Sequence, residues 1–217
     1  MLLENLRYDV IKCAVKMATL NLVVGTFGNV SARDPETNYV ALTPSGMDYN
    51  TLQPEDIVIL DLSGHVVDGH RKPTTETPMH MVAYQRRSDV NVVVHTHSVY
   101  ATALSVADEK LPIVVTEMAN VVGGEVLVAP YTTPGTVELG NTALNVMNDH
   151  MAVLLKNHGV LAVGDTMNTA LNVALIVEET AKIFCISKSL GRCDLVPEAA
   201  ISGLREAFLK YYGSSST

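Results

Sequence analysis

Apolar residues follow two different periods along this chain, and each period predicts one kind of secondary structure. A spacing of three or four residues is typical of a helix that packs on one face, and short apolar runs between turns predict buried strands. The helical spacing predicts helices over residues 2–20, from a cap at Thr74 or Thr75 to about Arg87, from just after Ser98, and over about 136–148, 166–190 and 197–211. The short runs predict strands over residues 39–42, 57–61, 66–67, 126–128, 151–155 and 160–163, and one that begins at Val92.

The order of these elements predicts a single α/β domain over residues 1–217. Strands and helices do not alternate strictly, and tight turns join several pairs of strands. This arrangement favours a mixed or mainly antiparallel central sheet covered by helices. A doubly wound parallel fold is the alternative, but no Gly-x-Gly-x-x-Gly motif follows a strand, which weakens it. Residues 213–217, Gly-Ser-Ser-Ser-Thr, are expected to be a disordered tail.

Composition limits the classes of protein to which the chain can belong. Of the 217 residues 47% are hydrophobic, which predicts a well-buried globular protein, and the net charge of −8 argues against nucleic acid as a partner. No apolar run reaches the roughly 20 residues of a membrane span, and the first residues lack the pattern of a signal peptide. The three cysteines have no CxxC spacing. We therefore expect a cytoplasmic protein that binds neither a membrane nor nucleic acid.

Two histidines stand two residues apart at the end of a valine-rich segment. In residues 92–98, Val-Val-Val-His-Thr-His-Ser, the valines predict a buried strand, and His95 and His97 follow at its carboxyl end. Side chains at i and i+2 of a strand point to the same face, so both imidazoles are expected to project together. Neutral imidazole is a common metal ligand, and two on one rigid edge form half of a zinc site.

His158 is the best candidate for a third ligand. It also ends a buried apolar strand, and Gly159 beside it permits close approach of the backbone. Three histidines match a catalytic zinc, which has three protein ligands and one open position. His80 is the strongest alternative ligand, although a structural role fits it better. The competing interpretation, that these histidines only form hydrogen bonds near the core, is weaker for a same-face pair joined by a third histidine.

Glu76 lies one helical turn before His80, near the expected start of a helix. There a glutamate can favour the helix dipole or complete a cap, which is a structural role. It can equally face a metal and act as the general base that proton abstraction beside a carbonyl requires. The residues alone leave both interpretations open.

Three short segments are rich in hydroxyl groups and are marked by glycine or proline: residues 25–29, 43–46 and 74–75. Such turns expose backbone N–H groups, and a helix start adds partial positive charge, so each segment is a candidate to hold an anion. Taken singly, each is more typical of an ordinary turn. None has the Walker sequence of a nucleotide-binding loop.

Five short motifs occur in a fixed order: Gly28-Asn29-Val30-Ser31, Thr43-Pro44-Ser45-Gly46, Thr75-Glu76-x-x-x-His80, His95-Thr96-His97 and His158-Gly159. Together they closely resemble the class II aldolase/adducin family. The resemblance extends from about residue 4 to 212, and the ordered set is specific although each piece alone is weak. Within the family the chain is most similar to the aldolases that cleave L-fuculose 1-phosphate.

The resemblance implies a three-layer fold and a metal-dependent lyase. It implies one Zn²⁺ per subunit, held by His95, His97 and His158, with Glu76 as a ligand of the resting metal that swings away to act as the base. It also implies a C4 homotetramer with active sites at subunit interfaces, where Tyr212 helps in proton transfer. The phosphate of the substrate would be bound by residues that match the family's phosphate-binding segments, namely Thr26, Gly28, Asn29, Ser45, Gly46, Thr74 and Thr75.

The implied reaction is the reversible cleavage of a ketose 1-phosphate to dihydroxyacetone phosphate and an aldehyde. The substrate that the resemblance favours is L-fuculose 1-phosphate, for which the aldehyde is L-lactaldehyde. One position departs from this pattern. Counted back from the glycine pair 123–124 without gaps, Glu117 stands where such aldolases carry a tyrosine donated by a neighbouring subunit. In this respect the chain resembles the methylthioribulose-1-phosphate dehydratases of the family, which use an acidic group at this position. Glu117 is therefore a candidate catalytic residue, and a dehydratase is the alternative enzyme.

Glu76 argues against two alternative enzymes of the family, the dehydratase and a sugar-phosphate 4-epimerase. It occupies its site as the aldolase pattern requires, whereas the 4-epimerases of the family have aspartate there. The alternative outside catalysis is an adducin-like interaction module that keeps the fold without the metal. The intact set of Glu76 and three histidines speaks against such a module.

Overall fold

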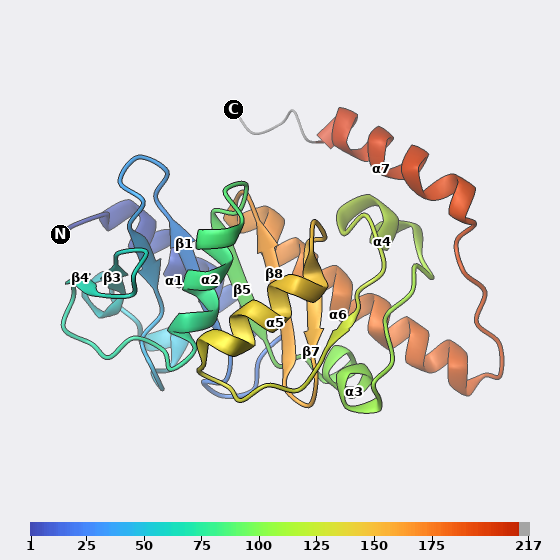
Figure 1. The fold of residues 1–217 in the computed structure, drawn as a ribbon, viewed down its shortest axis with the longest axis horizontal. Helices are drawn as coiled ribbons and strands as arrows, with labels where there is room; N and C mark the ends of the chain where they lie inside the picture. Colours follow the sequence, from blue (N-terminus) through green and yellow to red (C-terminus); the bar gives the residue numbers. More distant parts are fainter. Residues whose placement is uncertain (213–217) are drawn as a thin grey trace.

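The computed structural model describes residues 1–212, with the backbone only for Tyr212, and its elements form three layers (Figure 1). The middle layer is one sheet of eight strands in the order β4-β3-β2-β1-β5-β8-β7-β6. Neighbouring strands are antiparallel except β6 and β7, which are parallel. The predicted mixed, mainly antiparallel sheet is therefore confirmed. The strands are β1 (Asn29–Arg33), β2 (Val40–Leu42), β3 (Val58–Leu60), β4 (Val66–Asp68), β5 (Val92–Thr96), β6 (Val128–Ala129), β7 (Ala152–Leu155) and β8 (Gly159–Gly164).

Helices cover both faces of the sheet, and alternate residues of the central strands pack under them. Val93 joins the core beneath α2 and α5, whereas Val92 and Val94 join the core beneath α1, α3 and α6. None of the helices in the described part of the chain is long and apolar enough to cross a membrane. The helices are α1 (Glu4–Thr19), α2 (Thr77–Arg86), α3 (Val99–Ala107), α4 (Thr116–Val121), α5 (Val137–Met147), α6 (Met167–Ser189) and α7 (Glu198–Tyr212), with 3-10 turns η1 (Tyr49–Thr51) and η2 (Pro54–Asp56).

Three details of the predicted elements were wrong. Helix α2 begins at Thr77, so Glu76 and not a threonine occupies its cap position. Strand β6 begins two residues later than predicted and ends one residue later, because Val126 instead forms an isolated bridge with Leu111. The short helix α4 was not predicted, since six residues are too few for a helical period to show in the sequence.

Helix α7 lies against α4 at the outer side of the molecule, away from the sheet (Figure 1). The Arg205 guanidinium fixes this contact by donating to the carbonyl oxygens of Asn120 and Val121, the latter at 2.7 Å. Ile201 and Leu204 add apolar contacts to the core on that side. The C-terminal segment is thus joined to the domain chiefly through a six-residue helix.

The antiparallel order of β1, β5 and β8 brings three distant segments to one edge of the sheet. Asn29 at the start of β1 pairs with His95 near the end of β5. Thr96 pairs with Val160 at the start of β8, which places the residue before that strand, His158, at the same edge. Helix α2 begins at this edge too, so the sheet and one helix start converge there.

Candidate active site

Three imidazoles and one carboxylate meet at this edge of the sheet. One possible donor atom from each of Glu76, His95, His97 and His158 lies within 4.8 Å of all the others. His95 Nε2 lies 2.9 Å from His97 Nε2 and 3.0 Å from Glu76 Oε2. His158 Nε2 lies 3.2 Å from Glu76 Oε1. The structure therefore brings together the four side chains named from the sequence.

The orientation of the rings directs lone pairs toward the centre of the cluster. His95 Nδ1 donates to the carbonyl oxygen of Val160 at 2.9 Å, so in the neutral ring Nε2 carries the lone pair. Burial and the neighbouring rings of His95 and His158 lower the pKa of His97 to about 3, so the His97 ring is neutral near neutral pH. His95 Nε2 and His97 Nε2 face each other across 2.9 Å, so they either share one proton in a hydrogen bond or, when both are unprotonated, can hold a cation between them. This donor set fits a divalent cation that accepts imidazole and carboxylate ligands, as zinc does.

Glu76 supplies the negative charge of the cluster. Burial alone would raise the pKa of Glu76, but the rings of His95 and His158 lower it well below its ordinary range, so the side chain is a carboxylate. Its Oε2 accepts a hydrogen bond from Asn29 Nδ2 at 2.9 Å. Its Oε1 is buried, and no group in the described part of the chain forms a hydrogen bond with it. A buried carboxylate oxygen that has the His158 nitrogen 3.2 Å away is suited to share a cation with that nitrogen.

Two glycines make room for this edge of the sheet. A Cβ atom at Gly159 would lie 2.2 Å from the Thr96 carbonyl oxygen, so only glycine permits the observed approach of the two strands. The close approach predicted at Gly159 is confirmed. At Gly28, where φ is +103°, a Cβ atom would lie 2.8 Å from the His95 carbonyl oxygen.

The cluster opens into a pocket of about 390 Å³, and all three predicted anion segments reach it. Asn29 and Thr74 are buried, whereas Thr26, Ser45 and Thr75 are exposed. No lysine or arginine of the described chain lines the pocket, so an anion there would rely on hydroxyl groups, N–H groups and the start of α2. The residues named from the sequence that line it are Thr26, Gly28, Asn29, Ser45, Gly46, Thr74 and Thr75.

Three residues of the site were not found from the sequence. Phe27 and Pro134 line the pocket, and the centre of the Phe27 ring lies 5.8 Å from that of His97. The available signal was an aromatic residue next to a glycine in a polar turn. Tyr49 is buried and donates to the Gly28 carbonyl oxygen, and this hydrogen bond anchors the pocket-lining segment 25–29 to the core. Burial, with the nearby Glu76 charge, raises the pKa of Tyr49, so its hydroxyl stays a donor.

Of the three other candidates, two lie outside the cluster, and the side chain of the third is not among the described parts of the chain. His80 is not among the clustered donors and is hydrogen-bonded to Ser31 and Asn29, which matches the structural role favoured for it. Glu117 is exposed on α4 and does not line the pocket of its own chain. Tyr212 ends α7, and its side chain lies outside the described residues. The proposed roles of Glu117 and Tyr212 stay predictions.

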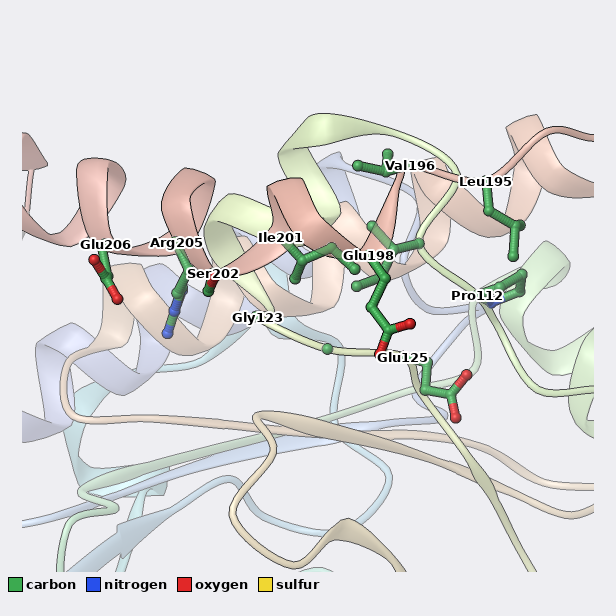
Figure 2. A pocket seen from close by; sticks show the side chains of 12 residues that line it. Pro112, Gly123, Glu125, Leu195, Val196, Glu198, Ile201, Ser202, Arg205 and Glu206 are labelled. Atoms are coloured by element: carbon green, nitrogen blue, oxygen red, sulfur yellow. The ribbon is translucent and has the colours of Figure 1, made fainter.

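A larger cavity, of about 700 Å³, lies beneath α7 (Figure 2). Its polar lining includes Glu125, Glu198 and Glu206. Arg205 also lines the cavity, and its guanidinium donates hydrogen bonds to backbone carbonyl oxygens. None of these residues belongs to a clustered donor set in the described part of the chain. The smaller pocket beside the histidines is therefore the candidate active site.

Comparison with known proteins agrees with this choice. Residues 8–185 match the family model described as Class II Aldolase and Adducin N-terminal domain. The chain belongs to the class II aldolase/adducin family. With the Glu/His cluster in place, the enzyme type predicted from the sequence, a class II metal-dependent aldolase, is confirmed.

Individual members of the family align with this class II aldolase over nearly its whole length. The 5-deoxy-D-ribulose 1-phosphate aldolase of Bacillus thuringiensis serovar kurstaki is 40% identical, with 97% of this chain and 99% of the relative covered. The 5-methylthioribulose-1-phosphate/5-deoxyribulose-1-phosphate aldolase of Rhodospirillum rubrum is 34% identical, with 97% and 94% covered. A solved L-fuculose 1-phosphate aldolase is 39% identical, covers 94% of this chain and 96% of its own, and has a TM-score of 0.90.

Proposed function

We propose that the protein is a zinc-dependent aldolase that reversibly cleaves a ketose 1-phosphate into dihydroxyacetone phosphate and a short aldehyde. The observation that carries the proposal is the buried carboxylate of Glu76 among three imidazoles, next to a pocket into which three exposed hydroxyl side chains project. Such a site offers a base and a cation position to the same small substrate.

The ligands proposed for the ion are His95, His97 and His158, with Glu76 completing the set in the resting enzyme. Zn²⁺ accepts this mixture of nitrogen and oxygen donors and keeps an open position in catalytic sites. A bound cation of this kind supplies Lewis acidity, which stabilises the negative charge that develops on the ketone half of the substrate.

The residues of the chain account for the movement of protons. In cleavage the C4 hydroxyl loses a proton, the C3–C4 bond breaks with its electron pair left on C3, and C3 then receives a proton. We assign this last transfer to Glu76, whose resting carboxylate would first take up a proton from solvent and then deliver it to C3; in the condensation direction the carboxylate would remove that proton as general base. From the family resemblance, Tyr212 and Glu117 of a neighbouring subunit would handle the proton at the C4 oxygen, in a C4 homotetramer.

The substrate phosphate is assigned to the exposed side of the pocket. Thr26, Ser45 and Thr75 present hydroxyl groups there, and the pocket adjoins the N-terminal end of α2, where the helix dipole favours an anion. Asn29 and Thr74 lie between this side and the carboxylate of Glu76, since Asn29 Nδ2 donates to Thr74 Oγ1 and to Glu76 Oε2. Binding the phosphate would therefore place the reacting carbons next to Glu76.

The aldehyde half of the substrate is the finer part of the proposal. Similarity to the two relatives named as 5-deoxyribulose 1-phosphate aldolases favours 5-deoxyribulose 1-phosphate as the substrate of this protein. Its cleavage between C3 and C4 would release acetaldehyde. L-fuculose 1-phosphate, expected from the sequence resemblance and supported by the solved L-fuculose 1-phosphate aldolase, would release L-lactaldehyde. Glu117 in place of the tyrosine departs from the pattern of the L-fuculose 1-phosphate aldolases, which weighs toward the first substrate. We place the reaction in the cytoplasm, where three free cysteines stay reduced.

A substrate panel tests the proposal. The purified protein, loaded with Zn²⁺, is given 5-deoxyribulose 1-phosphate, L-fuculose 1-phosphate and methylthioribulose 1-phosphate, and dihydroxyacetone phosphate is measured by a coupled reductase. We expect this product from at least the first ketose, together with acetaldehyde. Loss of water from methylthioribulose 1-phosphate without any dihydroxyacetone phosphate would identify a dehydratase and overturn the proposal.

A further inference from the structure

A line of buried polar side chains runs from Glu76 away from the pocket, between β1 and α2. Asn29 Nδ2 lies 2.9 Å from Glu76 Oε2, and Asn29 Oδ1 lies 2.5 Å from His80 Nε2. His80 Nδ1 lies 2.6 Å from Ser31 Oγ, which lies 2.6 Å from Tyr84 Oη. All five residues are buried, and His80 and Ser31 have no exposed surface. The proposed mechanism uses only the Glu76 end of this line.

The acceptor at one end fixes the direction of every hydrogen bond in the line. A carboxylate can only accept, so the Asn29 amide must turn its NH₂ group toward Glu76 and its oxygen toward His80. His80 must then carry its proton on Nε2 and accept at Nδ1. Ser31 therefore donates to His80, and Tyr84 donates to Ser31. A single assignment of protons thus satisfies the whole line.

Asn29 has a second bond that this assignment protects. Its Nδ2 also lies 3.2 Å from Thr74 Oγ1, in the segment that lines the phosphate side of the pocket. If the Asn29 amide turned over, its oxygen would face the Glu76 carboxylate and repel it, and its NH₂ would face the His80 N–H. The orientation of Asn29 therefore decides whether Glu76 is held or displaced.

We infer that His80 is a positioning residue for Glu76 and acts through Asn29. By donating from Nε2, it holds the Asn29 amide in the one orientation that anchors the carboxylate beside the metal ligands. Ser31 holds His80 in that tautomer by donating to Nδ1, and it can do so with or without the Tyr84 hydroxyl. The inference rests on the proposed function for its kinetic consequence, but the line itself exists without substrate.

The tautomer is the first test, and it needs neither metal nor substrate. In ¹⁵N-labelled metal-free protein, the two ring nitrogens of a neutral histidine give separate shifts for the protonated and the unprotonated site. The His80→Gln variant identifies the His80 signals by their loss. We expect a protonated Nε2 and an unprotonated Nδ1. A protonated Nδ1 would contradict the inference, because Nε2 would then accept from an amide turned the wrong way.

A pair of variants supplies the second test. Glutamine places its amide nitrogen and oxygen about as far apart as the two imidazole nitrogens, so His80→Gln can donate to Asn29 and accept from Ser31. His80→Leu has similar bulk but can do neither. We expect zinc affinity, measured by chelator competition, to fall about 10-fold in His80→Leu and to stay within about 3-fold in His80→Gln.

The same variants separate positioning from packing in the kinetics. With dihydroxyacetone phosphate release as the readout, His80→Leu should lower kcat about 10- to 100-fold with KM within about 3-fold, and His80→Gln should restore kcat. Tyr84→Phe is the matched control at the far end of the line, because it removes a buried hydroxyl without disturbing the bond from His80 to Asn29. Equal kcat in all three variants would overturn the inference, as would equal losses in the two His80 variants. If the wild-type protein cleaves no ketose 1-phosphate, the proposed function fails, whereas the tautomer and the zinc affinities still decide the role of His80.

Discussion

Acid should destabilise the protein measurably through His80. The side chain has no exposed surface, and burial lowers the pKa of His80 to about 3. In the unfolded chain the pKa of histidine is about 6.5. The unfolded chain therefore binds the proton more readily than the folded protein. It follows that the free energy of unfolding falls as the pH drops below about 6.5, and keeps falling until about pH 3.

The size of this effect follows from the two pKa values. For one such group, linkage gives a loss of stability of about 2 kcal/mol between about pH 7 and pH 5, out of about 5 kcal/mol over the whole window. Stabilities of ordinary domains are about 5–15 kcal/mol, so a loss of this size is easily resolved.

The assay compares the wild-type protein with His80→Gln, which keeps the two hydrogen bonds but cannot be protonated. Urea unfolding of the metal-free proteins is followed near pH 7 and near pH 5, at one fixed protein concentration. Other groups that become protonated in this range, such as His97, contribute to both proteins and cancel in the difference. We expect wild type to lose about 2 kcal/mol more than the variant. The same pH dependence in both proteins would refute the reasoning.

Three further substitutions test the site and its support. Glu76→Gln should retain metal and lower kcat about 10²- to 10⁴-fold, because the general base is lost, and retained turnover would remove Glu76 from the mechanism. His95→Ala should weaken zinc binding, measured by chelator competition, by more than about 100-fold, with activity lost in parallel, and unchanged binding would show that this nitrogen is no ligand. Gly159→Ala should lower the free energy of unfolding by about 3 kcal/mol, because its Cβ atom would meet the Thr96 carbonyl oxygen at 2.2 Å. Gly203→Ala on α7 is its control: beyond its own helix backbone and chain neighbours, no atom of the described residues lies within 4 Å of the new Cβ, so it should be neutral or slightly stabilising in the same urea titration.

The metal cluster could be predicted from the sequence because local geometry determines most of it. A strand repeats every two residues, so His95 and His97 had to share a face once the valines before them were buried. His158 was found by the same reasoning, since a polar residue at the end of a buried strand lies at the edge of the sheet. The antiparallel order of the strands then placed these ends at one edge, which the hydrophobic pattern alone did not specify.

The residues behind the cluster could not be predicted, because they meet only through long-range packing. Asn29 and His80 are 51 residues apart in the chain and form a hydrogen bond because β1 and α2 pack together. No periodicity in the sequence pairs them. The resemblance to the class II aldolases placed Asn29 in a phosphate-binding segment, and gave no indication that its amide also anchors Glu76.

The start of α2 shows why sequence rules fail at this site in particular. Threonine is a good helix cap, and its loss typically costs about 1 kcal/mol, so Thr74 and Thr75 were reasonable predictions. In the structure Glu76 occupies the cap position without a capping bond, since its carboxylate is turned to the histidines and the Thr74 hydroxyl accepts from Asn29. Pro78 in the first turn has no N–H to satisfy, which reduces the number of donors left without a partner. The start of α2 therefore lacks a stabilising side-chain cap, because the residues that could supply it bind other groups of the site. A helix start that departs from the usual capping preference in this way indicates a functional site before any ligand is known.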